Sequence, residues 1–383
     1  MNDKLDDETY ARAALTYLAE PADPCLATLL RAHGAVVALD AISTGRLPAI
    51  AEAPRGKRAM ESAMVRWRTR LPLLPPPDEV LAFRAAGIRL IRPGDPEWPG
   101  QLADLGDAQP YALWLRGQAD LRFNCLRAVA IVGSRAATAY GSYVAAEFAA
   151  SVAARGLAVI SGGAFGIDAA AHRGALGADG VTVAVLACGV DTPYPAAHTE
   201  LFDAIAAQGV IASEWPPGLH VSRLRFLIRN RVIAALAAGT LVVEAGERSG
   251  ALNTARHARD LNRRLMAVPG PVTSDLSAGC HQVIRDWQGL LVTSAAEVAE
   301  HLAPIGHLGS GQAGDVQDRN PRDLLDLDSA KVLDAMPRRG GLGTLRVAQR
   351  AGLAPATTGA CLGKLATAGF VERCDNGWRL RRA

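Results

Sequence analysis

Lysine is nearly missing from this 383-residue sequence. Of its 41 basic residues, 4 are lysines and 37 are arginines, and the formal net charge is only +3. This balance excludes a chain that is polycationic along its whole length. Arginine suits bidentate phosphate contacts better than lysine does, because its guanidinium is a planar fork of donors. Any nucleic-acid site must therefore be a local patch of arginines.

Paired cysteines and long apolar runs are also lacking. The six cysteines include no CxxC pair, which argues against a zinc module or a disulfide framework and for a reducing cytoplasm. The first residues, MNDKLDDE, are acidic and have no apolar core, so no secretory signal is expected. Apolar stretches such as VIAALAAGTLVVEA are interrupted well short of a membrane span. We therefore predict a cytoplasmic protein without a membrane partner.

The common signatures of catalysis are absent as well. The sequence contains no GxxxxGK[ST], no HExxH and no GxSxG. A formal GxGxxG match at 309–314 follows no strand pattern and opens no apolar helix, so we reject it as a dinucleotide loop. We predict a protein that is not an enzyme, with no catalytic residue, no metal site and no cofactor.

The sequence pattern divides the chain into four parts. Residues 1–75 read as short helices and end at a proline-rich break, LPLLPPPDE. Residues 80–302 alternate short β-branched runs with helical runs, which is typical of an α/β fold with a parallel sheet covered on both faces. Residues 303–323 are rich in Gly and polar residues and read as a linker. Residues 324–383 contain three helical runs and a hairpin signal at Asn376-Gly377, which together predict a winged helix.

Two glycine-containing loops follow predicted strands. In parallel sheets, ligands bind beyond the carboxyl ends of the strands. IVGSRAAT follows the first of these runs and offers Gly133, Ser134 and Arg135 as a phosphate anchor. SGGAFGID follows the next run, and its backbone N–H groups are expected to form an anion nest at a helix start. In this loop we interpret Asp168 as a helix cap or loop organiser. His172, four residues later, is either a histidine packed in the helix or a residue with a chemical role.

Arginines gather at the start of one predicted helix, RLRFLIRNRVIAAL. Positive charges there oppose the helix dipole, so we expect an external anion to compensate them. Arginines beside Phe226 are also suited to single-stranded nucleic acid, through phosphate contacts and base stacking. A solvated basic face is the alternative. Farther along, Glu244 precedes a helix start at Ser249-Gly250, and an acid/base pair of Asp168 and Glu244 is a weaker hypothesis.

Seven segments occur in an order that resembles one known family. They are GSR, SGGAFGIDAAAH, the YP of GVDTPYP, SEWPPG, FLIRNRVIAAL, VVEAGERSGALNTA and AVPG. Together they resemble the DNA-processing protein A (DprA/Smf) family over about residues 95–295. The upstream segments PEWPGQLADL and YALWLRG are similar to the lead-in of that family. The series is far more specific than any single motif in it.

The resemblance implies a fold and a function. The implied fold is an extended Rossmann-like domain that binds no dinucleotide, preceded by a sterile-alpha-motif or helix-hairpin-helix region and followed by a winged helix. The implied function is a homodimeric mediator that binds single-stranded DNA and loads the RecA recombinase onto incoming strands during natural transformation. From the residue patterns and the resemblance, the predicted DNA site comprises Gly133, Ser134, Arg135, Ser161, Gly162, Gly163, Phe165, Gly166, Asp168, Arg225, Phe226, Arg229, Asn230, Arg231, Ser249 and Gly250.

The chain departs from the family pattern at two places. Phe165 stands where the family usually has an arginine or a similar polar residue, so we expect one phosphate contact to be lost or to be replaced by stacking. The segment Gly279–Ile284 reads GCHQVI where the family tends to read GxNxLI.

Two other interpretations stay open: a Rossmann-like hydrolase of nucleotides, and a winged-helix regulator. In the hairpin region, arginines hint at phosphate contact, namely Arg373, Arg379, Arg381 and Arg382.

Overall fold

The computed structural model describes residues 5–49, 56–303, 325–337, 340–374 and 376–381. The chain separates into two compact units, 1–307 and 308–383, and each is described by itself. The predicted linker, apart from its first residue, and the rejected GxGxxG match lie outside the described residues. The boundaries of the four predicted parts therefore stay predictions.

The first unit contains twelve α-helices and nine strands among its described residues. Its helices are α1 (Asp7–Leu18), α2 (Pro24–Thr44), α3 (Lys57–Arg68), α4 (Pro77–Ala85), α5 (Leu121–Cys125), α6 (Ala139–Ala154), α7 (Ile167–Gly177), α8 (Thr199–Gln208), α9 (Arg223–Leu236), α10 (Gly250–Asp260), α11 (Ala278–Asp286) and α12 (Ala295–Leu302). Its strands are β1 (Ile88–Ile91), β2 (Leu113–Gly117), β3 (Ala128–Val132), β4 (Ala158–Ser161), β5 (Thr182–Leu186), β6 (Val210–Ser213), β7 (Gly239–Val242), β8 (Arg264–Ala267) and β9 (Leu290–Leu291). Four short 3-10 helices complete it, η1 (Leu71–Leu73), η2 (Gly100–Ala108), η3 (Ala196–His198) and η4 (Asp275–Ser277).

The nine strands form one sheet in the order β1-β2-β6-β5-β4-β3-β7-β8-β9. The pairs from β6 to β9 are parallel, as the alternating pattern predicts. The edge formed by β1 and β2 is antiparallel, so the sheet is mixed, and the parallel arrangement expected from the alternating runs is found from β6 to β9. These two strands precede the strand-helix repeat. A parallel pair requires a crossover connection, usually an α-helix, and no α-helix joins β1 to β2.

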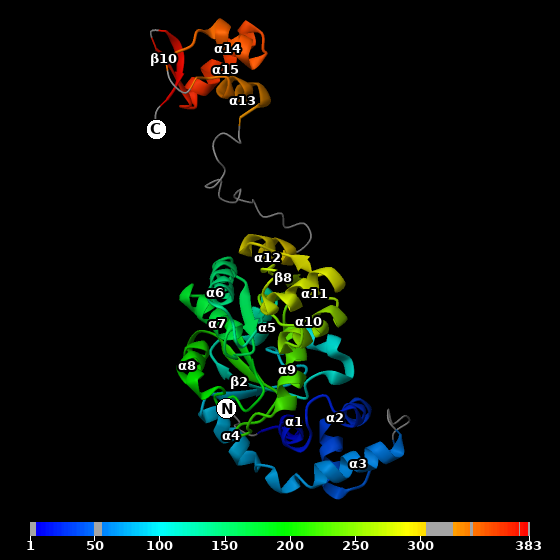
Figure 1. Cartoon of the computed structure of the whole chain (residues 1–383). Helices are drawn as coiled ribbons and strands as arrows, with labels where there is room; N and C mark the ends of the chain where they lie inside the picture. Colours follow the sequence, from blue (N-terminus) through cyan, green and yellow to red (C-terminus); the bar gives the residue numbers. More distant parts are fainter. Residues whose placement is uncertain (1–4, 50–55, 304–324, 338–339, 375, 382–383) are drawn as a thin grey trace. The chain divides into compact units, whose positions relative to one another are not determined.

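Helices cover both faces of this sheet. In β3, Val129 and Ile131 face the apolar cluster made with α6, α7 and α12, whereas Ala130 and Val132 face the cluster made with α9, α10 and α11. Figure 1 shows α6, α7 and α8 on one side of the sheet and α9, α10 and α11 on the other. Burial on both faces explains why these strands read as continuous apolar runs.

The sheet has a switch in its connections at β3. From β3 the chain proceeds to β4, β5 and β6 on one side, and then returns to β7 on the other side of β3. The helices that follow β3 and β6, α6 and α9, therefore lie on opposite faces, and the carboxyl end between them is where sheets of this kind bind ligands. The loops that follow β3, β4 and β7 meet at this edge.

The amino-terminal helices share a core of their own. Residues of α1, α2 and α3 pack around Leu15, Leu26 and Trp67, and Tyr111 from the sheet part joins them. Hydrogen bonds add to this contact: Arg12 donates to the Tyr111 carbonyl (2.8 Å), and the Trp114 indole donates to Thr16 Oγ1 (3.2 Å). Assignment of these helices to a sterile-alpha-motif or helix-hairpin-helix region stays a prediction.

Among the described residues, one helix, α2, is long and apolar enough to cross a membrane, by length and composition only. Half of its apolar stretch is buried inside the protein. Gly34 has φ 78° and ψ 175°, which interrupts the helix and agrees with the short helices read from the sequence for residues 1–75. A span requires about 20 continuous helical residues, and neither half of α2 provides them.

The second unit holds α13 (Leu327–Asp334), α14 (Thr344–Ala351) and α15 (Pro355–Thr367), followed by β10 (Val371–Cys374) and β11 (Gly377–Leu380). The two strands form an antiparallel hairpin that closes with Cys374 opposite Gly377. Val332, Leu362 and Leu365 belong to the apolar core of this unit. These elements match the three helical runs and the hairpin expected from the sequence, while the name winged helix stays a prediction.

Candidate nucleic-acid site

The loops after β3 and β7 are joined by hydrogen bonds. The backbone N–H of Ser134 donates to the Glu244 carbonyl (2.7 Å). The Glu244 carboxylate accepts from the backbone N–H (2.9 Å) and from the hydroxyl (2.5 Å) of Thr138, the residue that caps α6. Glu244 is buried, and its charge holds the two loops together. This arrangement gives Glu244 a structural role and leaves the hypothesis of an acid/base pair without support.

The glycine loop after β4 already holds an anion of its own. The Asp168 carboxylate accepts hydrogen bonds from the backbone N–H groups of Gly162 (3.2 Å) and Ala164 (3.4 Å). Burial raises the pKa of Asp168, and the Arg229 charge opposes that rise. The expected anion nest is therefore occupied in part by Asp168, as expected for a loop organiser. Ser161, also buried, donates its hydroxyl to the Ile131 carbonyl (2.6 Å).

Glycine is required in this loop where other groups approach the backbone closely. Gly166 has φ 74°, and a Cβ there would meet the Ser134 and Arg135 carbonyls. At Gly162, a Cβ would meet the Arg229 guanidinium, which donates to the Gly162 carbonyl (2.8 Å) and also to the Val185 carbonyl. These contacts hold the loops after β3 and β4 together and link the glycine loop, through Arg229, to β5.

Arg229 is a buried cation beneath these loops. Its side chain is only slightly exposed, and burial lowers its pKa to about 10, a shift that the Asp168 charge opposes. At neutral pH the guanidinium is still charged. It lies 6.0 Å from the centroid of the Phe226 ring. Arg229 therefore supports the loops and contributes positive electrostatic potential beneath them. Its guanidinium is not exposed for direct contact with a ligand.

The next two residues of α9 are also engaged in internal contacts. Arg231 makes a bidentate ion pair with Glu214 (2.6 Å for both bonds) and donates to the Ala108 carbonyl (2.9 Å). The side chains of this pair are only 5% and 3% exposed. The Asn230 amide donates to Gly250 O (3.3 Å) and Asn253 Oδ1 (3.2 Å). Both side chains are therefore engaged inside the protein, and their predicted role as DNA contacts stays a prediction.

A cluster of three aromatic rings and one guanidinium lies at the rim of the sheet, with Phe165 and Tyr194 exposed and Phe226 partly buried. The Arg135 guanidinium lies over the Phe226 ring, 4.7 Å from its centroid, and the Tyr194 ring lies 5.7 Å from the same ring. Phe165 is 48% exposed and packs edge-on against His198, at 4.6 Å between centroids. We call Arg135, Phe165, Tyr194 and Phe226 the rim cluster. Across the described residues, no carboxylate forms an ion pair with Arg135.

Two buried histidines pack in this part of the protein, one against the glycine loop and one against β4 and β5. His198 is buried and donates from Nδ1 to the Gly163 carbonyl (3.1 Å), which fixes the ring that backs Phe165. His172 donates from Nδ1 to the Thr182 hydroxyl (2.7 Å), which itself donates to the Val159 carbonyl. Burial lowers the pKa of His172 to about 3, so the ring is neutral. His172 is a packed histidine, one of the two alternatives read from the sequence.

Arg225 and the start of α10 complete the predicted set. Arg225 does not face an open rim, because its guanidinium is bound by Glu20 of the loop between α1 and α2, at 2.7 and 3.1 Å. Ser249 accepts from the Ala251 N–H (3.3 Å) and caps α10, while Gly250 is exposed. At the position of the expected asparagine, His281 donates to the Gly270 carbonyl (2.9 Å).

Sequence reasoning missed two residues of this region. Tyr194 lies in the quoted DTPYP segment, and its aromatic character was the available signal. Glu20 lies far from the site in sequence, and no pattern pointed to it. Among the residues that the structure describes, no group of three or more His, Cys, Asp or Glu side chains is arranged to hold a metal ion.

Comparison with known proteins identifies the family. The chain matches the DNA recombination-mediator protein A family over residues 89–303. It is 42% identical over 390 residues to a Mycobacterium tuberculosis protein named as a DNA processing protein DprA, covering 99% of this chain and 96% of that protein. The X-ray structure of DNA processing protein A from Streptococcus pneumoniae matches with a TM-score of 0.61 at 29% identity, covering 78% of this chain and 98% of that one.

A second solved structure describes the single-stranded DNA binding mode of DNA processing protein A from Helicobacter pylori. It matches with a TM-score of 0.51 at 26% identity, covering 56% of this chain and 95% of that one. The family match covers more than half of the chain, and the mycobacterial relative aligns over nearly all of it. The resemblance read from the motif series is therefore confirmed: the chain belongs to the DNA recombination-mediator protein A family, which includes the DprA and Smf proteins.

Proposed function

We propose that this protein binds single-stranded DNA at the rim cluster and acts as a recombination mediator without turning over a substrate. The observation that carries the proposal is the Arg135 guanidinium, stacked on Phe226 at the carboxyl edge of the sheet without a carboxylate partner among the described residues. The family membership and the DNA-binding mode described for the Helicobacter pylori protein support it.

The chemistry of the rim suits a polymer more than a soluble cofactor. An exposed guanidinium attracts a backbone phosphate, and exposed rings offer stacking surfaces to unpaired bases. Neither contact reads a sequence, because every nucleotide has a phosphate and a π face. The glycine loop, whose amides are partly taken by Asp168, then serves as a rigid floor that positions Phe165 and Arg135.

Replacing Arg135 with alanine is expected to weaken binding of labelled oligothymidine on the order of tenfold at low salt. The physical reason is the loss of one charge-assisted phosphate contact. The slope of log affinity against log salt is expected to become shallower by about 0.7 for one lost contact. Fluorescence anisotropy in a salt titration, with single and double strands compared, measures both effects.

The matched control is Arg155→Ala. Arg155 is also exposed, but it follows the end of α6 that lies away from the rim. It should leave both affinity and slope within error of the parent protein. Equal effects of the two substitutions would contradict the assignment of Arg135. Release of free base from nucleoside monophosphates would favour the hydrolase, and tight binding to one duplex sequence would favour the regulator.

Further parts of the proposal come from the family resemblance. They are loading of RecA onto incoming DNA during natural transformation, formation of a homodimer, a cytoplasmic location and a nucleic-acid role for the hairpin of the second unit. In that hairpin Arg373, Arg379 and Arg381 are exposed, although Arg379 pairs with Glu372 (2.7 Å). Arg382 lies outside the described residues. A chain ending near residue 305, tested for strand binding and RecA loading, separates the contributions of the two units.

A further inference from the structure

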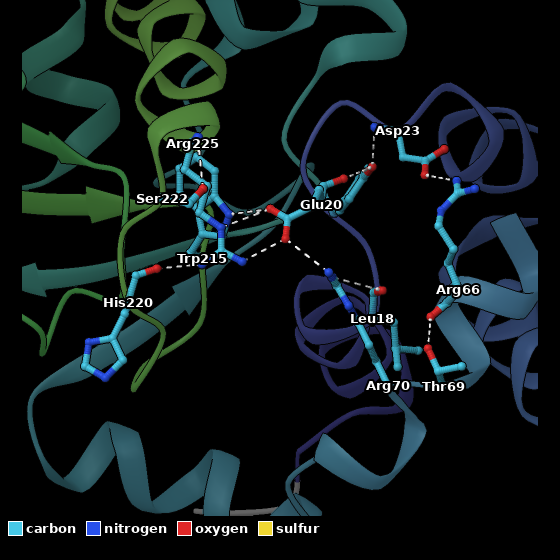
Figure 2. Close-up of polar contacts among 11 residues, drawn as sticks. Leu18, Glu20, Asp23, Arg66, Thr69, Arg70, Trp215, His220, Ser222 and Arg225 are labelled. Atoms are coloured by element: carbon cyan, nitrogen blue, oxygen red, sulfur yellow. Dashed lines mark hydrogen bonds and ion pairs between the residues drawn. The ribbon is translucent and has the colours of Figure 1, made fainter.

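Glu20 is the centre of a small network between the amino-terminal helices and the rim of the sheet (Figure 2). Its carboxylate accepts two hydrogen bonds from the Arg225 guanidinium and one from the Trp215 indole (3.0 Å). Arg70, just beyond α3, approaches the same carboxylate at 3.3 Å. Two arginines and an indole thus share one negative charge, an arrangement similar to that around a bound phosphate oxygen.

The carboxylate is ionised at neutral pH. Burial raises the pKa of Glu20, but the hydrogen bonds from Arg225 and Trp215 and the two arginine charges outweigh it and hold the pKa below its usual value. Glu20 is therefore the anion that compensates Arg225 in the first turn of α9, where no acidic residue lies. The external anion expected from the sequence is thus, for Arg225, a side chain of the same protein.

Arg225 is next to the rim cluster. It immediately precedes Phe226, whose ring contacts Arg135 and Tyr194. Adjacent residues of a helix point in different directions, so a strand stacked on Phe226 must extend around the start of α9 to reach Arg225. The Glu20–Arg225 contact is also partly open to solvent, with side chains 33% and 14% exposed. The buried pair of Glu214 and Arg231, in contrast, is closed to any ligand.

The loop that carries Glu20 is held independently of its carboxylate. The Tyr111 hydroxyl donates to the Glu20 carbonyl (3.2 Å) and accepts from the Asp23 N–H (2.9 Å). Arg12 and Trp114 fasten α1 to the sheet at two further points. The side chain of Glu20 can therefore turn away from Arg225 without separating the amino-terminal helices from the sheet.

We propose that Glu20 is an internal competitor for DNA phosphate: its carboxylate occupies Arg225 in the free protein and yields that guanidinium to a strand bound at the rim cluster. This inference rests on the proposed function. It predicts that part of the binding free energy of each strand is spent on displacing Glu20. The parent protein then binds more weakly, and with a smaller salt dependence, than its arginines permit.

The test is Glu20→Gln in the full chain, with oligothymidine binding measured as above. The amide keeps the size of the side chain and an acceptor for Trp215 but removes the charge that competes with phosphate. Affinity at low salt is expected to rise about three- to tenfold, and the salt slope to steepen by at most about 0.7, because binding no longer frees a Glu20 charge that takes up a cation. In the double variant Glu20→Gln, Arg225→Ala the gain should disappear.

Asp23→Asn is the matched control. Asp23 lies in the same loop, pairs with Arg66 (3.4 Å) and caps α2, a task that asparagine performs equally well. It removes the same charge without touching Arg225, so affinity should change less than twofold. An equal gain in this control, an unchanged Glu20→Gln variant, or a gain that survives loss of Arg225 would each overturn the inference. If Arg135→Ala also has no effect, the proposed function itself fails; if Arg135→Ala weakens binding, only the competition by Glu20 fails.

Discussion

Replacing Arg231 with methionine is expected to lower the free energy of unfolding by about 3–5 kcal/mol. The substitution leaves the Glu214 carboxylate buried without its bidentate partner, and it also removes donors from the Ala108 and Ile228 carbonyls. An uncompensated buried charge is among the most costly changes in a protein interior. Urea denaturation followed by circular dichroism measures the effect.

Two further variants make this prediction specific. Combining Arg231→Met with Glu214→Leu removes both charges and should restore much of the lost stability, because apolar residues of similar volume often replace a buried ion pair without cost. Arg285→Ala removes an exposed arginine paired with Asp286 and should leave the urea midpoint unchanged. A loss below about 1 kcal/mol in Arg231→Met would contradict the structural role. So would a shallower salt slope of DNA binding, measured well below the unfolding midpoint.

Most of the sheet could be read from the sequence because its strands obey one rule. Each strand from β3 to β7 is buried on both faces, and β8 is buried after its exposed first residue, Arg264, so these strands are mainly apolar whichever way a side chain points. β1 and β2 differ, since Arg89 and Arg116 interrupt their apolar pattern. They also join the sheet antiparallel, through contacts that a local pattern does not contain.

The site was predicted less well, because a sequence names the charged groups but not their partners. Arg225, Arg229 and Arg231 read alike along the chain, yet each meets a different partner. Arg225 meets a carboxylate 205 residues away, Arg229 meets backbone carbonyls, and Arg231 meets Glu214. Helical spacing places Arg225 and Arg229 on one face of α9, one turn apart, and turns Arg231 to another side. Only the folded chain shows that two of the three are buried.

The same reasoning explains why Arg135 and Phe226 stand out. Arg135 follows a strand end in a loop whose backbone is already fixed by Ser134 and Gly166, so its side chain is left to project outward. Phe226 lies one turn inside α9, where a ring can reach over the loop and contact the guanidinium. The positions of Arg135 and Phe226 do not require a bound ligand. Both side chains lie at the carboxyl edge of the sheet, where parallel sheets bind their ligands.

Replacing Phe226 with alanine is expected to weaken oligothymidine binding by about 10- to 100-fold, which corresponds to the loss of one stacked base. The loss should hardly change the salt slope, because stacking releases no counterions. This separates it from Arg135→Ala, in which the slope itself falls.

Phe226→Trp should keep most of the affinity, since an indole also offers a π face to a base and to Arg135. Phe123→Ala is the control, because Phe123 is 73% exposed on α5, which precedes β3 and so lies away from its carboxyl end. Binding within twofold of the parent protein in Phe226→Ala would show that the rim rings do not stack on bases. A loss in Phe226→Ala that appears only through a shallower salt slope would assign the ring to the support of Arg135 instead, because a guanidinium without its aromatic platform loses its fixed position before it loses its charge.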